Sequence, residues 1–266
     1  MFTIRKLSPG ALSLLLAAAA PASHAATDDN PWGLQVYAGD SLGMHGNFST
    51  NRAKDVPDLG PIIPELAETP GTIALETVTY DDMYKSRYAV GAELSYALGE
   101  NAEAYGRFGY NALDGQTHTI GLLSSAALEK TAPIVGHFND TDTYSLMLGG
   151  RYYVPTGDSW RVFGGVALGA TRLHDMTGAL DIPDTSTTLD GLRFARATTV
   201  FSQSLEAGID YQSPQNIDLQ LTIAGERTGA ARAGNDPQLA ALGFDTSREG
   251  DARWSFPLTL GATYRF

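Results

Sequence analysis

The chain has 266 residues, with 30 acidic residues against 18 basic ones and no cysteine. The lack of cysteine excludes disulfides, thiolate metal sites and cysteine nucleophiles. The formal net charge of −12 argues against a nucleic-acid partner, because phosphate binding relies on clustered Lys and Arg. The 29 glycines, together with many Tyr and Thr, are typical of an all-β chain.

The first 25 residues have the order of a secretory signal peptide. Arg5 and Lys6 precede the apolar run ALSLLLAAAA (11–20), and SHA (23–25) supplies small residues for cleavage. We therefore expect a signal peptide over 1–25 and a mature domain over 26–266, with a net charge of −14 after Arg5 and Lys6 are removed. No later stretch approaches the roughly 18 apolar residues that a membrane helix needs.

Eight segments of the mature sequence alternate between apolar and polar residues, which predicts β-strands with two different faces. Short connections at 99–101, 155–159 and 212–216 alternate strictly with long ones at 44–84, 113–140, 173–196 and 229–250. This rule is expected of an up-and-down barrel whose two ends face different compartments. The predicted strands are 32–43, 85–98, 102–112, 141–154, 159–172, 197–211, 216–228 and 251–266.

The two faces of these strands differ in chemistry. One parity is apolar and free of central charges, as in Tyr144, Leu146 and Leu148. The opposite parity carries the charges, so the apolar face would be outside and the polar face inside, as lipid demands. The predicted lumen charge network is Lys85, Arg87, Glu93, Glu103, Arg107, Arg151, Arg161, Glu206, Asp210, Asp218, Glu226, Arg253 and Arg265.

Aromatic residues also sort by depth along the predicted strands. Trp32, Tyr96 and Trp160 stand beside the short turns, whereas Tyr88 and Tyr144 lie near the long connections. Two belts of amphipathic rings are typical of the two membrane interfaces. We therefore predict an all-β, eight-stranded, antiparallel up-and-down transmembrane barrel, with four long extracellular loops and three short periplasmic turns. A soluble lipocalin-like barrel is the alternative, but it would need polar residues on its outer face.

The last eight residues, TLGATYRF, carry a polar residue, a glycine two positions on, and aromatics at the third-last and last positions. With the strand pattern, this ending resembles the small eight-stranded outer-membrane barrels of Gram-negative bacteria, the OmpA-like superfamily. The resemblance implies an integral outer-membrane location and recognition of the last strand by the outer-membrane insertion machinery. The assembly-signal residues would be Thr259, Gly261, Tyr264 and Phe266.

Pro257 departs from this pattern because it lies within the last predicted strand. Proline cannot donate a ladder hydrogen bond, and a closed barrel has no free edge on which to place it. We expect a bulge or a locally broken pairing at this position.

The narrow lumen of an eight-stranded barrel bears on function. Charges of both signs inside it should pair, which predicts a largely occluded core. We expect a structural or surface-interaction role without catalysis or cofactor, with a narrow or gated porin-like channel as the alternative. An envelope-lipid-modifying enzyme is the third possibility, since His45, His118, His137 and His174 fall near Ser124, Ser125, Asp140, Asp142 and Asp175 in the long connections.

The long connections hold most of the negative charge: residues 45–84, 113–139, 174–195 and 229–250 contain 16 acidic residues against 6 basic ones. A solvated acidic surface is the simplest interpretation. The Pro-rich stretch DLGPIIPELAETPG (58–71) suggests instead a segment that docks a partner or caps the barrel mouth. The expected partners are outer-membrane lipid, the insertion machinery and an unidentified extracellular ligand, and we expect a monomer.

Overall fold

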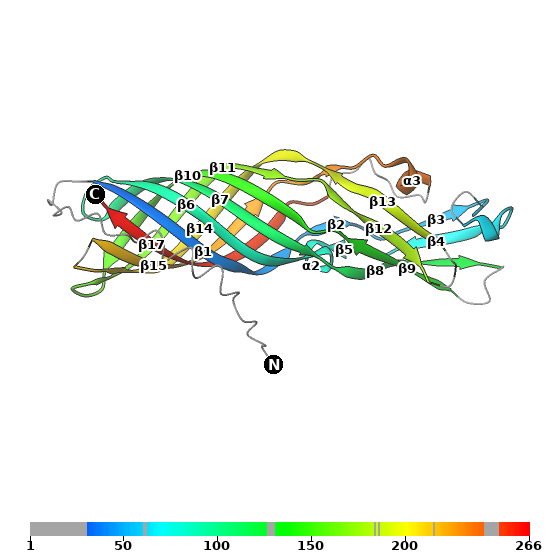
Figure 1. Ribbon diagram of the computed structural model, residues 1–266, viewed down its shortest axis with the longest axis horizontal. Coiled ribbons are helices and arrows are strands. Elements are labelled where there is room, and N and C mark those ends of the chain that lie inside the picture. The colour runs from blue at the N-terminus through cyan, green and yellow to red at the C-terminus, as the bar shows by residue number, and fades with distance from the viewer. Residues whose placement is uncertain are drawn as a thin grey trace.

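The computed structural model describes residues 31–60, 63–126, 131–183, 185, 187–214, 216–241 and 250–266. The expected signal peptide at 1–25 lies outside these residues. Eight long strands close into one antiparallel barrel in the order β1-β17-β15-β14-β11-β10-β7-β6 (Figure 1). They are β1 (Trp32–His45), β6 (Tyr84–Ala97), β7 (Ala102–Gly115), β10 (Thr141–Pro155), β11 (Trp160–Leu173), β14 (Thr198–Gln212), β15 (Ile217–Thr228) and β17 (Arg253–Arg265).

The eight predicted strands are confirmed, with each end within three residues of its predicted position. The outer face of the barrel is apolar and exposed, as shown by Leu146 (63 % exposed), Leu148 (70 %) and Leu205 (68 %). Soluble proteins do not leave such a continuous apolar surface in water. This exterior is the one required of a barrel that spans a membrane.

Aromatic rings mark both ends of the barrel wall. At the end with the short turns, the rings of Trp32 and Tyr96 meet edge-on at 4.9 Å. At the opposite end, Tyr110 lies between Tyr88 (6.0 Å) and Tyr144 (5.0 Å). The predicted belts are therefore present. As in other barrels of this kind, the short turns belong to the periplasmic side and the long connections to the outside.

The described residues of the long connections are folded, and we call those that lie within 46–83, 116–140, 174–197 and 229–241 the extracellular module. Two hairpins extend almost without interruption from barrel strands, since β8 begins two residues after β7 ends. The module extends the molecule beyond the barrel (Figure 1). Its seven-stranded sheet has the order β16-β13-β12-β9-β8-β4-β3, and β2 pairs with β5. The strands are β2 (Asn47–Ser49), β3 (Arg52–Val56), β4 (Gly71–Leu75), β5 (Val78–Thr79), β8 (Thr117–Ser125), β9 (Ala132–Phe138), β12 (Met176–Ile182), β13 (Thr187–Arg196) and β16 (Arg232–Ala233).

Three short helices complete the module: η1 (Pro64–Leu66), α2 (Tyr80–Met83) and α3 (Pro237–Ala241). Within the described part of the chain, no helix is long and apolar enough to cross a membrane. The helices instead help to cover the hydrophobic core, to which η1 contributes Leu66 and α2 contributes Tyr80 and Met83.

The module has its own hydrophobic core, which the sequence analysis did not predict, and its acidic residues such as Asp55 and Glu65 are exposed outside that core. Ile73, Leu123, Ile134 and Leu180 from four sheet strands are each no more than 2 % exposed. Burying one such side chain contributes about 1.5–3 kcal/mol, enough to offset the ordering of the chain around it. The Pro-rich stretch belongs to this core, where Leu59 and Ile63 are 0 % exposed; residues 61–62 lie outside the described residues.

The expected disturbance at Pro257 is confirmed. On the β1 side, Ser41 pairs with Pro257 and Met44 with Ser255, so β1 carries one extra residue there. On the β15 side, the pairing is interrupted between Leu258 and Ser255 without a change of register. A bulge in the neighbouring strand thus accommodates the missing N–H of the proline.

Candidate functional site

The lumen is divided into layers, and its periplasmic half contains a dense ion-pair network around Arg151. Its Nε donates to Glu206 at 2.5 Å, and its Nη2 donates to Glu93 at 2.7 Å. Arg107 bridges the same two carboxylates, at 2.8 Å from Glu93 and 2.7 Å from Glu206. Four charged side chains from strands β6, β7, β10 and β14 are thereby tied together across the lumen.

A second group of ion pairs continues the network toward the short turns. Arg161 pairs with Asp210, and Arg265 donates to Asp218 at 2.6 Å. Arg265 also lies 3.4 Å from Glu103, which links this group to Arg151. The buried acids and bases compensate one another, since leaving one of them unpaired would cost several kcal/mol. We call this set the lumen network: Arg107, Arg151, Arg161, Arg265, Glu93, Glu103, Glu206, Asp210 and Asp218.

Aromatic rings fill the space between these charges. The guanidinium of Arg151 lies 4.2 Å from the ring centre of Tyr105, and that of Arg161 lies 4.1 Å from Tyr153. Tyr105 fits because Gly149 faces it on β10, where a Cβ would come within 2.4 Å of the ring. An eight-stranded barrel is narrow enough for side chains to fill it. The lumen network and these rings therefore occlude the periplasmic half of the lumen.

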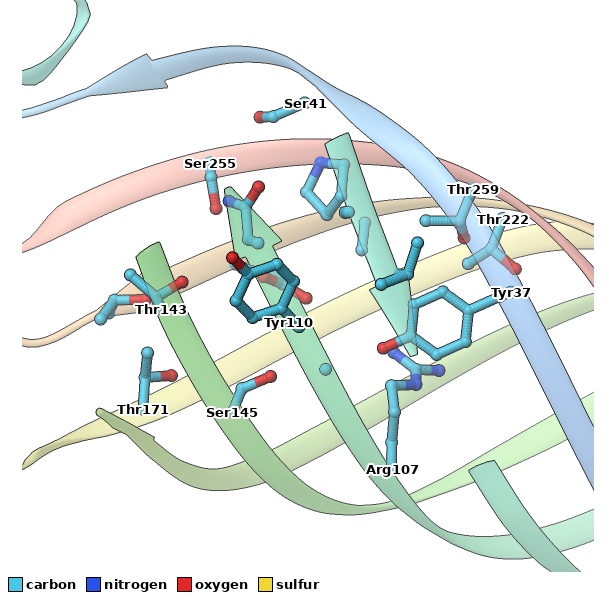
Figure 2. Close-up of a pocket in the computed structure, with 18 of the residues that line it drawn as sticks. Tyr37, Ser41, Arg107, Tyr110, Thr143, Ser145, Thr171, Thr222, Ser255 and Thr259 are labelled. Atoms are coloured by element: carbon cyan, nitrogen blue, oxygen red, sulfur yellow. The ribbon is translucent and has the colours of Figure 1, made fainter. Parts of the chain in front are cut away.

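Above the lumen network lies a polar chamber, shown in Figure 2. Tyr37 and Arg107 lie at its lower side, where their ring and guanidinium are 5.7 Å apart. The volume of the cavity is about 70 Å³. Most of its side chains are hydroxyls or charged groups: Ser41, Thr143, Ser145, Thr171, Thr222, Glu226, Thr228, Arg253, Ser255 and Thr259.

An apolar roof separates the chamber from the outside. Asn111 and Thr171 line the chamber, and two residues further along their strands the inward positions are Leu113 and Leu173, 1 % and 3 % exposed. These two residues belong to the hydrophobic core of the module. The roof consists of Met44, Tyr80, Met83, Tyr84, Leu113 and Leu173.

The helix α2 is held in the roof by a capping box. The hydroxyl and backbone N–H of Thr79 both donate to Asp82, at 2.7 Å and 2.8 Å, and the N–H of Asp82 donates back to Thr79 Oγ1. Burial raises the pKa of the Asp82 carboxyl, but the two hydrogen bonds from Thr79 outweigh it and hold this pKa below its usual range. His118 Nε2 stands 3.8 Å from the same carboxyl.

Two predicted members of the charge network lie elsewhere. Lys85 and Arg87 were expected in the lumen, but both are exposed, and Arg87 lies 3.7 Å from Asp114 at the outer rim. A bulge between Ser86 and Tyr88 reverses the parity of the strand at this point. The other eleven residues face the lumen, with nine of them in the lumen network and Glu226 and Arg253 in the chamber.

The candidate catalytic residues are dispersed among structural contacts. The imidazole of His137 lies 3.0 Å from Thr117, and Asp140 accepts from the N–H of Gly115 at 2.9 Å. His174 and Asp142 do come together, hydrogen-bonded through Nδ1 beside Tyr144. His45 packs against Phe256 at 5.6 Å, whereas Ser125 donates to Pro70 and Ser124 lies near Thr131. Asp175 accepts from the N–H of Ala197. The described residues contain no cluster of three or more His, Asp or Glu side chains that could hold a metal ion.

The expected assembly signal consists of four residues, which lie on β17 or directly after it: Thr259, Gly261, Tyr264 and Phe266. Thr259 lines the chamber, and Gly261 faces the side chain of Gln35. The rings of Tyr264 and Phe266 stack at 6.2 Å at the periplasmic end of the wall. This geometry leaves the last ring on the outside, where Phe266 is 44 % exposed.

The sequence analysis missed the neutral members of the lumen. Tyr105, Tyr153 and Phe163 have the same parity as the predicted charges, and they are 3–4 % exposed. Gln35 and Gln220 hydrogen-bond across two strands at 3.0 Å. These residues have the same strand parity as the predicted lumen charges, and this parity could have placed them in the lumen.

The chain has weak similarity to several solved structures. No family model matches the chain, and no curated protein matches it. Solved structures that are similar include Neisserial surface protein A (13 % identity, 88 % of this chain and 97 % of that one, TM-score 0.40). The outer membrane protein AlkL (13 %, 93 % and 95 %, 0.45) and the outer membrane protease OmpT of Escherichia coli (8 %, 92 % and 99 %, 0.35) are also similar.

These similarities are too weak to transfer a function to this chain. The architecture rests on the chain itself, which has a closed eight-stranded barrel, an apolar exterior and two aromatic belts. The protein is an integral outer-membrane β-barrel of the small eight-stranded type.

Proposed function

We propose that this protein is a non-conducting barrel that presents its extracellular module for contacts at the cell surface. The observation that carries the proposal is the single hydrophobic core shared by the long connections, with Leu59, Leu123, Leu180 and Leu239 all buried in it. Such a core gives a rigid surface outside the membrane, as recognition requires. The occluded lumen supports the same view, because a pore would need to open both the lumen network and the roof.

A cell-based test separates the module from the barrel. The full chain and a variant with 46–83, 116–139, 174–197 and 229–252 replaced by short Gly/Ser turns are produced in a bacterium without adhesins of its own. We expect attachment to immobilised matrix proteins or cell clumping only with the full chain, at equal amounts of heat-modifiable barrel. Equal behaviour of the two strains would refute the proposed surface role.

Conductance tests the second half of the proposal. Purified protein in planar lipid bilayers should give no large, steady single-channel steps, since Arg151 and its partners fill the lumen. Steady steps in the full chain would instead support the narrow or gated channel.

An envelope-lipid enzyme is the second candidate function. The pair formed by Asp142 and His174 favours it, because a carboxylate that holds Nδ1 leaves Nε2 free to accept a proton. The pair borders a surface groove of about 500 Å³ together with Tyr88 and Tyr110, at the outer aromatic belt. Mass spectrometry of the envelope lipids would reveal such an activity as a mass change with the native chain that is absent with His174→Ala.

We further propose that the protein inserts as a monomer and that its last strand is read by the insertion machinery. The exposed ring of Phe266 beside Tyr264 supports this role. Removing Phe266 should reduce the heat-modifiable protein in cells while leaving refolding into lipid vesicles unchanged. An equal loss in both assays would show that Phe266 serves only the stability of the barrel.

A further inference from the structure

The wall of the chamber contains a buried polar atom that the described residues do not satisfy. Among the described residues, three buried side-chain atoms lack a hydrogen-bond partner: Tyr84 Oη, Ser204 Oγ and Arg253 Nε. Arg253 lines the chamber and is only 5 % exposed. Leaving such groups without a partner costs about 1–3 kcal/mol each. An unsatisfied charged side chain at the wall of a cavity indicates a site that is completed by something other than protein.

In the barrel register, Ser204 and Arg253 flank one carboxylate, that of Glu226. Glu226 lies directly opposite Ser204 on β14 and opposite Ser255 on β17. The next inward row, one step closer to the roof, holds Ser202, Thr228 and Arg253. Tyr84 belongs to the roof and lies within electrostatic range of Arg253.

Arg253 and Glu226 are close in register, yet their charged atoms do not come within the 4.0 Å of an ion pair. A hydroxyl group placed between them can donate to the carboxylate of Glu226 and accept from the guanidinium of Arg253. A neutral hydroxyl-bearing molecule also adds no net charge to a buried site, and an added charge there would cost several kcal/mol. The surrounding hydroxyls of Thr222, Thr228 and Ser255 extend the same chemistry.

The barrel wall has a gap that leads to this chamber. The ladder between β1 and β6 ends at the pair of Gly39 and Ala89, although both strands continue beyond it. In the unpaired stretch, the N–H of Ser41 reaches Ser86 Oγ at 3.3 Å. A surface pocket of about 340 Å³ lies at this gap, lined among others by Ser41, Leu42, Lys85 and Ser86. Ser41 borders both the pocket and the chamber.

We propose that the chamber is a binding site for a small, neutral, hydroxyl-rich molecule of about the size of glycerol, which enters through the gap between β1 and β6. The site uses Arg253 as donor and Glu226 as acceptor. The lumen network below and the roof above leave the side of the wall as the shortest route in. The molecule reaches the gap from the outer interface, where Lys85 and Asp81 provide a polar entrance.

Titration with glycerol tests the site in the full mature chain in lipid nanodiscs. The methyl NMR signals of Thr222 and Thr228 should shift and saturate, while that of the exposed Thr119 shows no saturable change. In Arg253→Met, the glycerol concentration at the midpoint of the titration should rise about tenfold or more, as expected for the loss of a hydrogen bond to a charged group. The matched control is Arg172→Met on the exposed side of β11, which should leave the midpoint unchanged.

Several outcomes would overturn the site. Shifts that grow linearly with glycerol, and equally in native protein and Arg253→Met, would mean that the chamber holds water alone. Saturation by acetate at lower concentration than by glycerol would identify an anion site instead. If Arg253→Met does not fold, the isosteric Glu226→Gln must weaken glycerol binding, and an unchanged midpoint there would equally refute the proposal.

The entrance is tested separately by closing it. Because the chain lacks cysteine, Ser41→Cys/Ser86→Cys can be joined selectively by a short bifunctional thiol reagent. Cross-linking should slow glycerol exchange at Thr228 at least tenfold compared with the same variant before treatment. An exchange rate that does not change would refute the lateral route while leaving the binding site itself to the titration.

Discussion

The barrel and the extracellular module are built from the same alternating strands, but they place their side chains in opposite ways. In the barrel, the exposed residues are apolar (Leu148, 70 % exposed) and the buried ones include charges (Arg151, 4 %). In the module, the buried residues are apolar (Leu123, 1 %) and the exposed ones are mostly polar, such as Thr119. Period-two alternation therefore specifies a two-faced strand, and the solvent decides which face turns outward.

The interior of the barrel and the interior of the module are continuous. Inward positions on β7 run from Arg107 in the lumen network through Asn111 in the chamber to Leu113 in the roof. Their chemistry changes from charged to polar to apolar over six residues. The roof is thus the point at which the polar interior of a membrane barrel becomes the apolar interior of a water-exposed module.

Removing Arg151 should have the largest effect, because it leaves Glu93 and Glu206 short of a partner inside the barrel. For Arg151→Met, we expect the free energy of unfolding to fall by about 3–5 kcal/mol. Tryptophan fluorescence during denaturant unfolding in lipid vesicles measures this change. The matched control, exposed Arg172→Met, should lie within about 0.5 kcal/mol of the native protein. A similar loss of unfolding free energy in both variants would mean that the lumen network does not stabilise the barrel.

A cavity in the module core tests whether the module folds as a unit above the barrel. Ile134 on β9 is 2 % exposed, so Ile134→Ala should cost about 2–5 kcal/mol locally. Hydrogen exchange should speed up across β8, β9 and β12, while amides of the barrel strands stay protected and the gel shift on heating persists. Thr119→Ala on the exposed side of β8 is the control and should change nothing. Uniform loss of protection in both regions would contradict the separation of the two cores.

A charge on the outer wall tests which solvent surrounds the barrel. Leu148 is 70 % exposed near the middle of β10, and Leu148→Arg should cost about 2–4 kcal/mol in a bilayer. The same change at exposed Thr119 in the module should cost less than about 0.5 kcal/mol, since water surrounds it. Unfolding in vesicles again provides the measurement. If Leu148→Arg were as harmless as Thr119→Arg, the apolar wall would not face lipid.

The barrel strands were predictable because long alternating segments stand between clear turns, and both faces carry a consistent chemistry. The module was not, because its strands are shorter and their alternation is broken by register shifts, as between Thr119 and Gly121 or between Gly178 and Leu180. Lys85 and Arg87 were misplaced for the same reason, since parity cannot be read across a bulge. The chamber was beyond sequence reasoning altogether, because it depends on how far Glu226 and Arg253 stand apart.

The smallest expected effect concerns the roof and the capping box of α2. Because the pKa of Asp82 is lower in the folded protein than in the unfolded chain, its contribution to stability is fully present above the unfolded value near 4. That contribution is lost as the pH falls through the lower folded value.

In Asp82→Asn, the amide protection of Tyr80 and Met83 should be weaker than in the native protein at pH 6. The difference should shrink on acidification to about pH 3, because protonation removes the same charge from the native side chain. Hydrogen exchange at the two pH values measures this, with the distant Asp181→Asn as control. A difference that stays constant with pH would show that the carboxylate charge does not hold α2 in the roof, and that the hydrogen-bond geometry of the box suffices.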